Sequence, residues 1–246
     1  MSLGVLLTLL TTTGFGEFER LDATLAAPGA TQDVLFGFDE PSGFLGEGLE
    51  HWPVGRSLWQ GYIGVLVLEA AAVSGGTTPP IDLADDAFEM LPSLGGGAQY
   101  KLGGERASWG IEGMVDFAGR SDGVAFYSGA GGALLAVDVD LATLALCGGP
   151  FVSLVVGEKV RVYAAGGGLM QWTWYDQTGA SAADTADGNG FGAGYYARAG
   201  FEYLLPNHTL LGLGGRWSDA RVDLSGDLGH MELRGTQVLL TVSRSM

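Results

Sequence analysis

The sequence from residue 58 onward contains eight segments in which apolar and polar residues alternate, separated by stretches that are alternately long and short. A period of two places successive side chains on opposite faces of a β-strand. Strands of about ten residues, joined by short turns at one end and longer loops at the other, build a barrel that crosses a membrane. The pattern therefore predicts an all-β fold, an eight-stranded antiparallel up-and-down transmembrane β-barrel over residues 58–246.

The alternation is clearest in segments 106–118, 160–175 and 191–203. In the last of these, one face carries aromatic residues and alanines, whereas the other carries glycines together with Arg198 and Glu202. We expect the aromatic face to contact lipid and the polar face to line the lumen. Segments 58–69 and 136–152 alternate weakly, because both of their faces are largely apolar.

The connections support the same topology. Segments 102–106, 156–159 and 205–208 hold residues that favour tight turns or stay solvated. The other connections are rich in Gly, Ser, Thr and Asp, and the predicted outer loops are 70–86, 119–135, 176–190 and 223–230. We place the short turns on the periplasmic side, and an even strand count then puts both ends of the barrel there.

The composition is consistent with a sheet rather than with helices. The chain has 43 Gly, only 16% charged residues and no stretch of about 20 apolar residues such as a membrane helix needs. A net charge of −16 argues against a nucleic-acid partner, whose phosphates would be repelled. A single cysteine, Cys147, excludes an intramolecular disulfide framework.

Residues 1–57 lack the alternating pattern. A short apolar run from Leu3 to Leu10 is too brief to span a bilayer but suits the hydrophobic part of a signal peptide. No Lys or Arg precedes the run, and no clean small-residue cleavage site follows it. We expect a signal peptide at 1–14 and an irregular periplasmic lead-in at 15–57; a misassigned start codon or a buried apolar segment is the alternative for the first part.

The last quarter of the chain carries a family resemblance. From residue 190 it reads Gly-Phe-Gly-Ala-Gly-Tyr-Tyr-Ala-Arg-Ala-Gly-Phe-Glu-Tyr, later Gly-Leu-Gly-Gly-Arg-Trp-Ser-Asp-Ala-Arg-Val-Asp, and it ends on a strand with Val238, Leu240, Val242 and Met246 on one face. This stretch resembles the last three strands of small outer-membrane β-barrel proteins, the outer-membrane protein A and W-like group. The final strand resembles their C-terminal assembly signal, although Met246 stands where Phe or Trp is usual.

The resemblance implies a location and a set of partners. It places the protein in the cell envelope of a Gram-negative bacterium, as a porin-like protein of the outer membrane. It implies contact with outer-membrane lipids and assembly by the barrel assembly machinery. It also leaves room for small solutes as ligands, and we expect a monomer.

A soluble eight-stranded barrel, such as a lipocalin, is the alternative fold. It would hold its aromatic side chains inside and its charges outside, whereas here the aromatic face is nearly free of charge. Aromatic residues also lie near strand ends, as in the interfacial girdles of membrane barrels. The predicted membrane-interface aromatics are Trp109, Trp172, Trp174, Tyr203 and Trp217.

The predicted lumen face collects charged residues of both signs. The interior of an eight-stranded barrel is just wide enough for side chains to fill it. We therefore expect a structural network of ion pairs across the lumen, and the alternative is a narrow polar pore gated by Arg and Glu. The predicted network consists of Lys101, Glu112, Asp116, Asp138, Asp140, Arg161, Arg198, Glu202 and Arg216.

The three histidines, His51, His208 and His230, do not recur at a ligand spacing. A lipid-acting enzyme would need a serine and a histidine within hydrogen-bond reach near the outer rim. His230 with Ser218 or Ser225 is the candidate pair, but we expect His230 to be a solvated loop residue. The chain is therefore not expected to be an enzyme.

An acidic stretch that contains Asp184, Asp187 and Asn189 vaguely resembles a calcium loop. It lacks the full spacing and the terminal bidentate Glu of such loops. We expect neither a metal site nor a cofactor.

These observations favour an outer-membrane barrel with a structural or surface-interaction role. A narrow channel or carrier for small solutes is the second hypothesis, and a lipid-acting enzyme is the third.

Overall fold

The structure, a computed structural model, describes residues 56–75, 81–82, 90–128, 134–179, 185–206 and 208–245. They fall within one compact unit, Glu47–Met246. The predicted signal peptide, nearly all of the lead-in and Met246 lie outside the described residues. Within these residues, no helix is long and apolar enough to cross a membrane.

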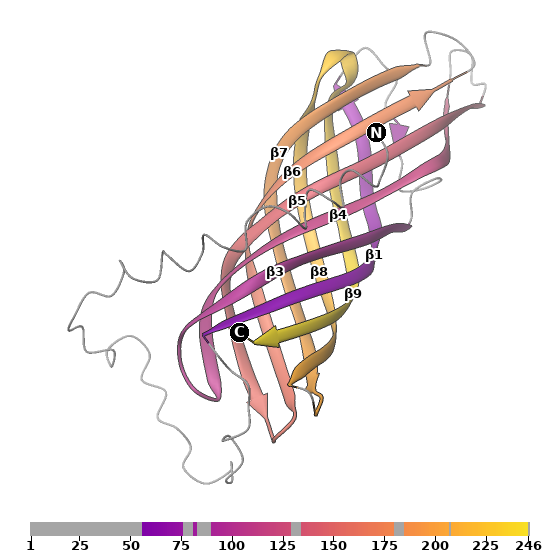
Figure 1. Cartoon of the computed structure of the whole chain (residues 1–246). Helices are drawn as coiled ribbons and strands as arrows, with labels where there is room; N and C mark the ends of the chain where they lie inside the picture. Colours follow the sequence, from indigo (N-terminus) through magenta and orange to yellow (C-terminus); the bar gives the residue numbers. More distant parts are fainter. Residues whose placement is uncertain are drawn as a thin grey trace, which may run out of the picture. The chain divides into compact units, whose positions relative to one another are not determined.

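Eight long strands form a single antiparallel sheet (Figure 1). Each long strand pairs with the next along the chain, and the two-residue strand β2 (Ile81–Asp82) pairs with the end of the first. The long strands are β1 (Ser57–Gly75), β3 (Met90–Gly103), β4 (Ala107–Ser128), β5 (Leu134–Val156), β6 (Val160–Thr178), β7 (Ala186–Leu204), β8 (Thr209–Leu224) and β9 (Gly229–Ser245).

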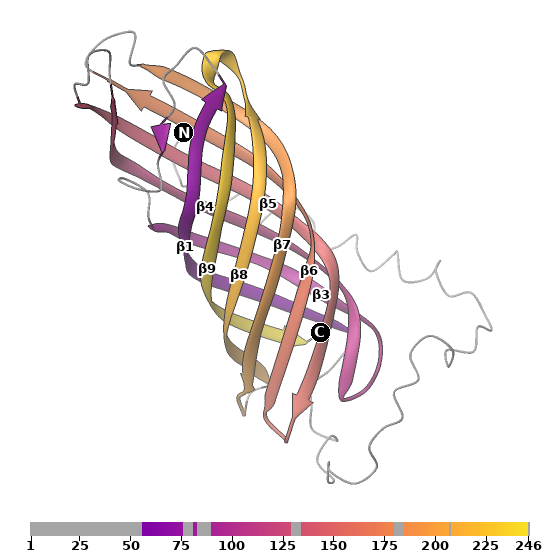
Figure 2. The same cartoon turned by 180° about the vertical axis from the view of Figure 1, so that it is seen from behind.

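The sheet closes on itself through β1 and β9. Their pairing runs from Leu58 opposite Ser245 to Gly75 opposite Gly229, and the indigo and yellow strands lie side by side in Figure 2. The beginning of β1 and the end of β9 are therefore at the same end of the barrel. The predicted eight-stranded antiparallel barrel is confirmed.

The predicted alternation of the two faces is confirmed in the clearest strands. In β6, the outward Trp172 is 42% exposed whereas its neighbour Thr173 is fully buried in the lumen. In β7, the outward Phe201 is 52% exposed and the inward Glu202 is fully buried. The barrel is apolar outside and polar inside over much of its length.

Large apolar side chains are exposed on every long strand of the barrel, for example Ile63, Ile111, Val152 and Leu240. A protein surrounded by water rarely exposes contiguous apolar surface of this extent. An outward apolar band around a barrel with a polar interior is the surface of a membrane-spanning barrel. The soluble alternative is therefore wrong.

The connections opposite the short turns are shorter than predicted, because the strands continue into the regions assigned to loops. β4 and β5 are 22 and 23 residues long and remain paired as far as Ser128 opposite Leu134. A strand needs only about 9–11 residues to cross a bilayer. Beyond the hydrocarbon the outward face meets water, so the alternation of hydropathy fades while the backbone pairing continues.

The three short turns lie where the sequence predicted them. Gly104, Gly157 and His208 adopt positive φ angles of 84°, 65° and 61°. This left-handed region suits glycine, which has no Cβ, and is uncommon for histidine.

A β-bulge interrupts β1. The register of β1 against β9 shifts between Leu68 and Ala70. Before the bulge the even-numbered residues face the lumen, and after it Ala71 and Val73 do so. The bulge therefore turns Ser74 outward, which strict alternation from residue 58 would not predict.

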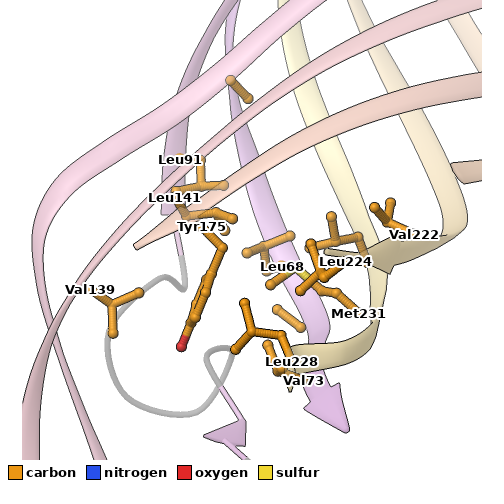
Figure 3. Packing of buried hydrophobic residues seen from close by; sticks show 13 residues of the cluster. Leu68, Val73, Leu91, Val139, Leu141, Tyr175, Val222, Leu224, Leu228 and Met231 are labelled. Atoms are coloured by element: carbon orange, nitrogen blue, oxygen red, sulfur yellow. The ribbon is translucent and has the colours of Figure 1, made fainter. Parts of the chain in front are cut away.

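Apolar side chains fill the lumen at the end opposite the short turns (Figure 3). Leu228, in the short 3₁₀ turn η4 (Gly226–Leu228), packs with the inward residues of the neighbouring strands. This apolar cluster consists of Leu68, Ala71, Val73, Leu91, Ala118, Val139, Leu141, Tyr175, Val222, Leu224, Leu228, Met231 and Leu233.

The membrane-spanning surface makes a quantitative prediction. Leu240→Arg places a charge in the middle of the outward apolar band of β9 and should reduce the free energy of unfolding by about 2–4 kcal/mol. Thr178→Arg is the control, because Thr178 is exposed at the far end of β6 opposite Asp138. We expect at most about 1 kcal/mol for this variant. Denaturant unfolding in lipid vesicles measures the free energy of unfolding of both variants. Equal small losses in the two variants would contradict a lipid-facing Leu240.

Candidate functional site in the barrel lumen

Three buried ion pairs connect strands inside the barrel. Arg161 Nη1 lies 2.7 Å from Glu202 Oε2, and Arg198 Nε lies 3.3 Å from Glu112 Oε1. Arg216 Nη2 lies 2.6 Å from Asp116 Oδ2. The six side chains are between 0% and 7% exposed. The charges of the three pairs cancel, so this part of the lumen is electrically neutral.

The strand register explains how these residues meet. Arg161 and Glu202 are directly opposite each other on the adjacent strands β6 and β7. Glu112 and Asp116 lie on the same face of β4 and reach across the lumen to Arg198 on β7 and Arg216 on β8. Two of the three pairs therefore connect strands that are not neighbours in the sheet.

Two glutamines join two of the ion pairs into a closed ring of hydrogen bonds and ion pairs. Gln60, on β1, donates from Nε2 to Glu202 Oε1 at 3.0 Å and accepts from Arg198 Nη2 at 2.6 Å. It therefore connects the carboxylate of one pair to the guanidinium of the other. The six-residue ring consists of Gln60, Gln99, Glu112, Arg161, Arg198 and Glu202.

Gln99, on β3, makes the matching connection. It donates from Nε2 to Glu112 Oε2 at 2.8 Å and accepts from Arg161 Nη2 at 2.5 Å. Each glutamine uses its amide group in both directions, as donor to a carboxylate and as acceptor from a guanidinium. The six-residue ring thus cross-links five strands: β1, β3, β4, β6 and β7.

Additional donors satisfy the two buried glutamates. Ser243 Oγ donates to Glu202 Oε1 at 2.7 Å, and Tyr196 Oη donates to Glu112 Oε1 at 2.9 Å. The Arg198 guanidinium also lies over the ring of Tyr163, 4.8 Å from its centroid. Buried charges repay their desolvation only when good geometry and further hydrogen bonds accompany the ion pair. The six-residue ring meets that condition.

The third pair lies nearer the apolar cluster. Gln237 Nε2 donates to Asp116 Oδ1 at 3.2 Å. Within the described part of the chain, the Nε atoms of both Arg216 and Arg198 have no hydrogen-bond acceptor. A small cavity lies beside Asp116 and Arg216, and its other lining residues include Leu66, Leu91 and Gln171.

The structure brings six of the nine predicted lumen residues together, the members of the three ion pairs. Lys101 is half-buried near the short-turn end of β3. Asp138 and Asp140 are exposed on the outward face of β5, so their assignment to the lumen is wrong. Their neighbours Val139 and Leu141 occupy the inward positions. The error arose because both faces of segment 136–152 are largely apolar, and the sequence does not show which face is inward.

The sequence reasoning missed the polar neutral members of the network. Gln60 and Gln99 are 5% and 3% exposed and connect the charged pairs, yet a search for charged residues overlooks them. The available signal was their position. Gln99 lies two residues before Lys101, and Gln60 lies two residues before Tyr62. A period of two therefore places Gln99 on the same strand face as Lys101, and Gln60 on the same face as Tyr62.

The predicted interface aromatics all lie on the outward face. Trp109 and Tyr203 are close to the short turns. Trp172 and Trp174 lie nearer the other end, where Trp172 packs on Phe191 with ring centroids 4.6 Å apart, and Trp217 lies at the middle of β8. This arrangement suits two aromatic girdles, one at each membrane surface.

One of the three histidines, His230, differs from the prediction. His208 is exposed in a turn, and His51 lies outside the described residues. His230 is not a loop residue, because β9 begins at Gly229, and its Nε2 lies 3.1 Å from Ser74 Oγ. In the part of the chain that the structure describes, neither candidate serine, Ser218 or Ser225, is hydrogen-bonded to His230. The Ser225 hydroxyl accepts a hydrogen bond from the Asn189 backbone, and Ser218 occupies an inward position of β8.

The acidic stretch that resembled a calcium loop is only partly described. Asp187 and Asn189 are exposed on the outward face of β7, and Asp184 lies outside the described residues. Among the residues with described positions, no group of three His, Cys, Asp or Glu side chains is placed to hold a metal ion.

No protein-family model and no curated protein matches the sequence. Solved structures are similar in fold. The outer membrane protein OprG from Pseudomonas aeruginosa aligns with a TM-score of 0.49 at 12% identity, over 81% of this chain and 100% of that one. Ail, the attachment invasion locus protein of Yersinia pestis, aligns with a TM-score of 0.41 at 13% identity, over 77% and 99% of the two chains. The outer membrane protease OmpT from Escherichia coli gives 0.47 at 9% identity, over 81% and 100%.

The six-residue ring should contribute strongly to stability. Arg198→Ala leaves the buried Glu112 without its ionic partner and should cost about 3–5 kcal/mol of unfolding free energy. Arg234→Ala is the matched control, because Arg234 pairs with Asp219 at the surface with side chains 48% and 27% exposed. Such surface pairs contribute at most about 1 kcal/mol. Urea unfolding in detergent measures both variants, and equal midpoints would refute a structural role for the ring.

Proposed function

We propose that the protein is an outer-membrane β-barrel with a structural or surface-interaction role, whose lumen does not conduct. The observation that carries this proposal is the filling of the lumen at two levels. The six-residue ring lies toward the short-turn end of the barrel, and the apolar cluster occupies the opposite end.

The two levels oppose permeation for different reasons. A solute that crosses the ring must break buried hydrogen bonds and ion pairs, which leaves charges uncompensated in the lumen. An ion that crosses the apolar cluster must lose its hydration, since hydrophobic constrictions close pores by excluding water. Together they favour a barrel that serves as a rigid anchor.

The outward face beyond the apolar band supports a role at the outer surface. Asp176 and Asp187 are exposed and lie directly opposite each other on β6 and β7. Carboxylates in this arrangement repel one another. Cations from the medium or cationic groups of surface molecules would relieve the repulsion, so we propose that this end of the barrel meets divalent ions, surface lipids or the environment.

The outward face of the barrel also bears on the lipid contacts, the assembly and the oligomeric state of the protein. The outward apolar band would contact outer-membrane lipids, and insertion would use the barrel assembly machinery. The seam between β1 and β9 closes the sheet, which supports a monomer.

A narrow channel or carrier for small solutes is the second candidate. The cavity beside Asp116 and Arg216 favours it, because its volume of about 20 Å³ leaves room for a water molecule next to a buried ion pair.

Planar-bilayer recording separates the two candidates. The folded wild-type protein should produce no discrete current steps. Arg216→Ser enlarges the cavity without touching the apolar cluster, so this variant should also be silent. Discrete openings of the wild type, and larger steps in Arg216→Ser, would overturn the anchor proposal and support the channel.

A further inference from the structure

A serine and a histidine are hydrogen-bonded on the outside of the barrel. Ser74 Oγ lies 3.1 Å from His230 Nε2, and both side chains are half-buried. The two residues are directly opposite each other on β1 and β9. A serine hydroxyl within hydrogen-bond reach of an imidazole nitrogen is the minimal arrangement of an activated nucleophile and its base.

A carboxylate lies on the other side of the histidine. Asp223, on β8, is directly opposite His230 and faces outward. Directly opposed residues of antiparallel strands have Cβ atoms about 4.5–5.5 Å apart. Serine, histidine and aspartate therefore follow one another across three neighbouring strands, in the order of a nucleophile, a base and a group that orients the base.

The bulge in β1 creates this juxtaposition. Without the register shift at Glu69, the alternation that places Gln60, Tyr62 and Leu68 in the lumen would also turn Ser74 inward, away from His230. Bulges occur beside active sites, where they redirect a side chain.

The same row of residues leads to the membrane-facing aromatics. Asp223 is directly opposite Phe191 on β7, and Phe191 is opposite and packed against Trp172 on β6. Strands are spaced about 4.8 Å apart, so roughly 14 Å separates the positions of Phe191 and Ser74. An amphiphilic molecule held against the apolar band and the two aromatic rings could therefore present a bond near its polar head to Ser74.

We propose that Ser74 and His230 form an esterase site on the outer rim of the barrel, which cleaves acyl esters of amphiphiles at the membrane surface, with Asp223 as a positioning residue. The proposal goes beyond the structural role and rests only on the membrane-facing exterior of the barrel.

The reaction has two balanced steps. Ser74 Oγ forms a bond to the ester carbonyl carbon while His230 Nε2 takes the hydroxyl proton, and the ester C–O bond then breaks as Nε2 gives that proton to the leaving alkoxide. In the second step His230 removes a proton from a water molecule, whose oxygen attacks the acyl-serine carbonyl. The acyl–Oγ bond breaks, the proton returns to Ser74, and a carboxylic acid leaves.

A fluorophosphonate probe tests the nucleophile directly, because it phosphonylates activated serines. In the wild-type barrel folded in detergent, mass spectrometry should locate the adduct at Ser74. Ser74→Ala should abolish labelling, and His230→Gln should slow it by roughly 10²-fold or more. Ser121→Ala, which removes an exposed serine on β4, should label like the wild type. Each variant is used only if it keeps the wild-type gel mobility before boiling.

Hydrolysis of p-nitrophenyl esters in mixed micelles tests the substrate class and the positioning residue. Long-chain esters should be cleaved faster than p-nitrophenyl acetate. Asp223→Asn should lower kcat about tenfold or more with little change in KM, whereas Asp223→Glu should recover part of kcat. The proposal is overturned if the folded wild type shows no labelling above the boiled sample, if Ser74→Ala labels normally, or if no ester is cleaved.

Discussion

The backbone of a strand in a bilayer must find all its hydrogen-bond partners within the protein, because the hydrocarbon offers none. In this chain the pairing of β1 with β9 meets that requirement by closing the sheet, and the other features follow from the closure. A closed barrel of eight long strands has a narrow interior, so every inward side chain is surrounded by others from the opposite wall. Charged residues can occupy such a lumen only where a partner lies within reach.

The lumen is filled by different kinds of side chain at its two levels. Toward the short-turn end, three guanidinium groups match three carboxylates, and Gln60 and Gln99 connect two of the pairs into a ring. Toward the end opposite the short turns, the lumen carries no such pairs among its described residues and is filled by the apolar cluster. The large negative charge of the chain therefore lies outside the neutral ring, and on the described strands much of it faces outward beyond the apolar band.

Much of the fold could be predicted from the sequence, because lipid on one side and a polar lumen on the other impose a period of two. The period correctly placed Glu112, Arg161, Arg198 and Glu202 in the interior. It failed for Asp138 and Asp140, where both faces of the strand are apolar and the phase is undefined. The strand ends were also misjudged, since pairing beyond the membrane does not require alternation.

The contacts that complete the candidate sites could not be predicted in this way. The glutamines of the ring carry no charge to mark them, and their partners are far away in sequence. Ser74 and His230 are 156 residues apart, and they meet only because one bulge reverses the alternation of β1. A register shift of one residue follows from packing between strands, which the sequence of a single strand does not reveal.

The central claim, a closed membrane barrel held together across its lumen, is tested most directly by gel mobility in SDS. The purified chain, folded into detergent, is compared before and after boiling. We expect a compact band before boiling that shifts to the unfolded position afterwards, because SDS does not open a closed and internally bonded barrel at room temperature. A chain that shows no shift, and that stays folded and soluble without detergent, would contradict the account.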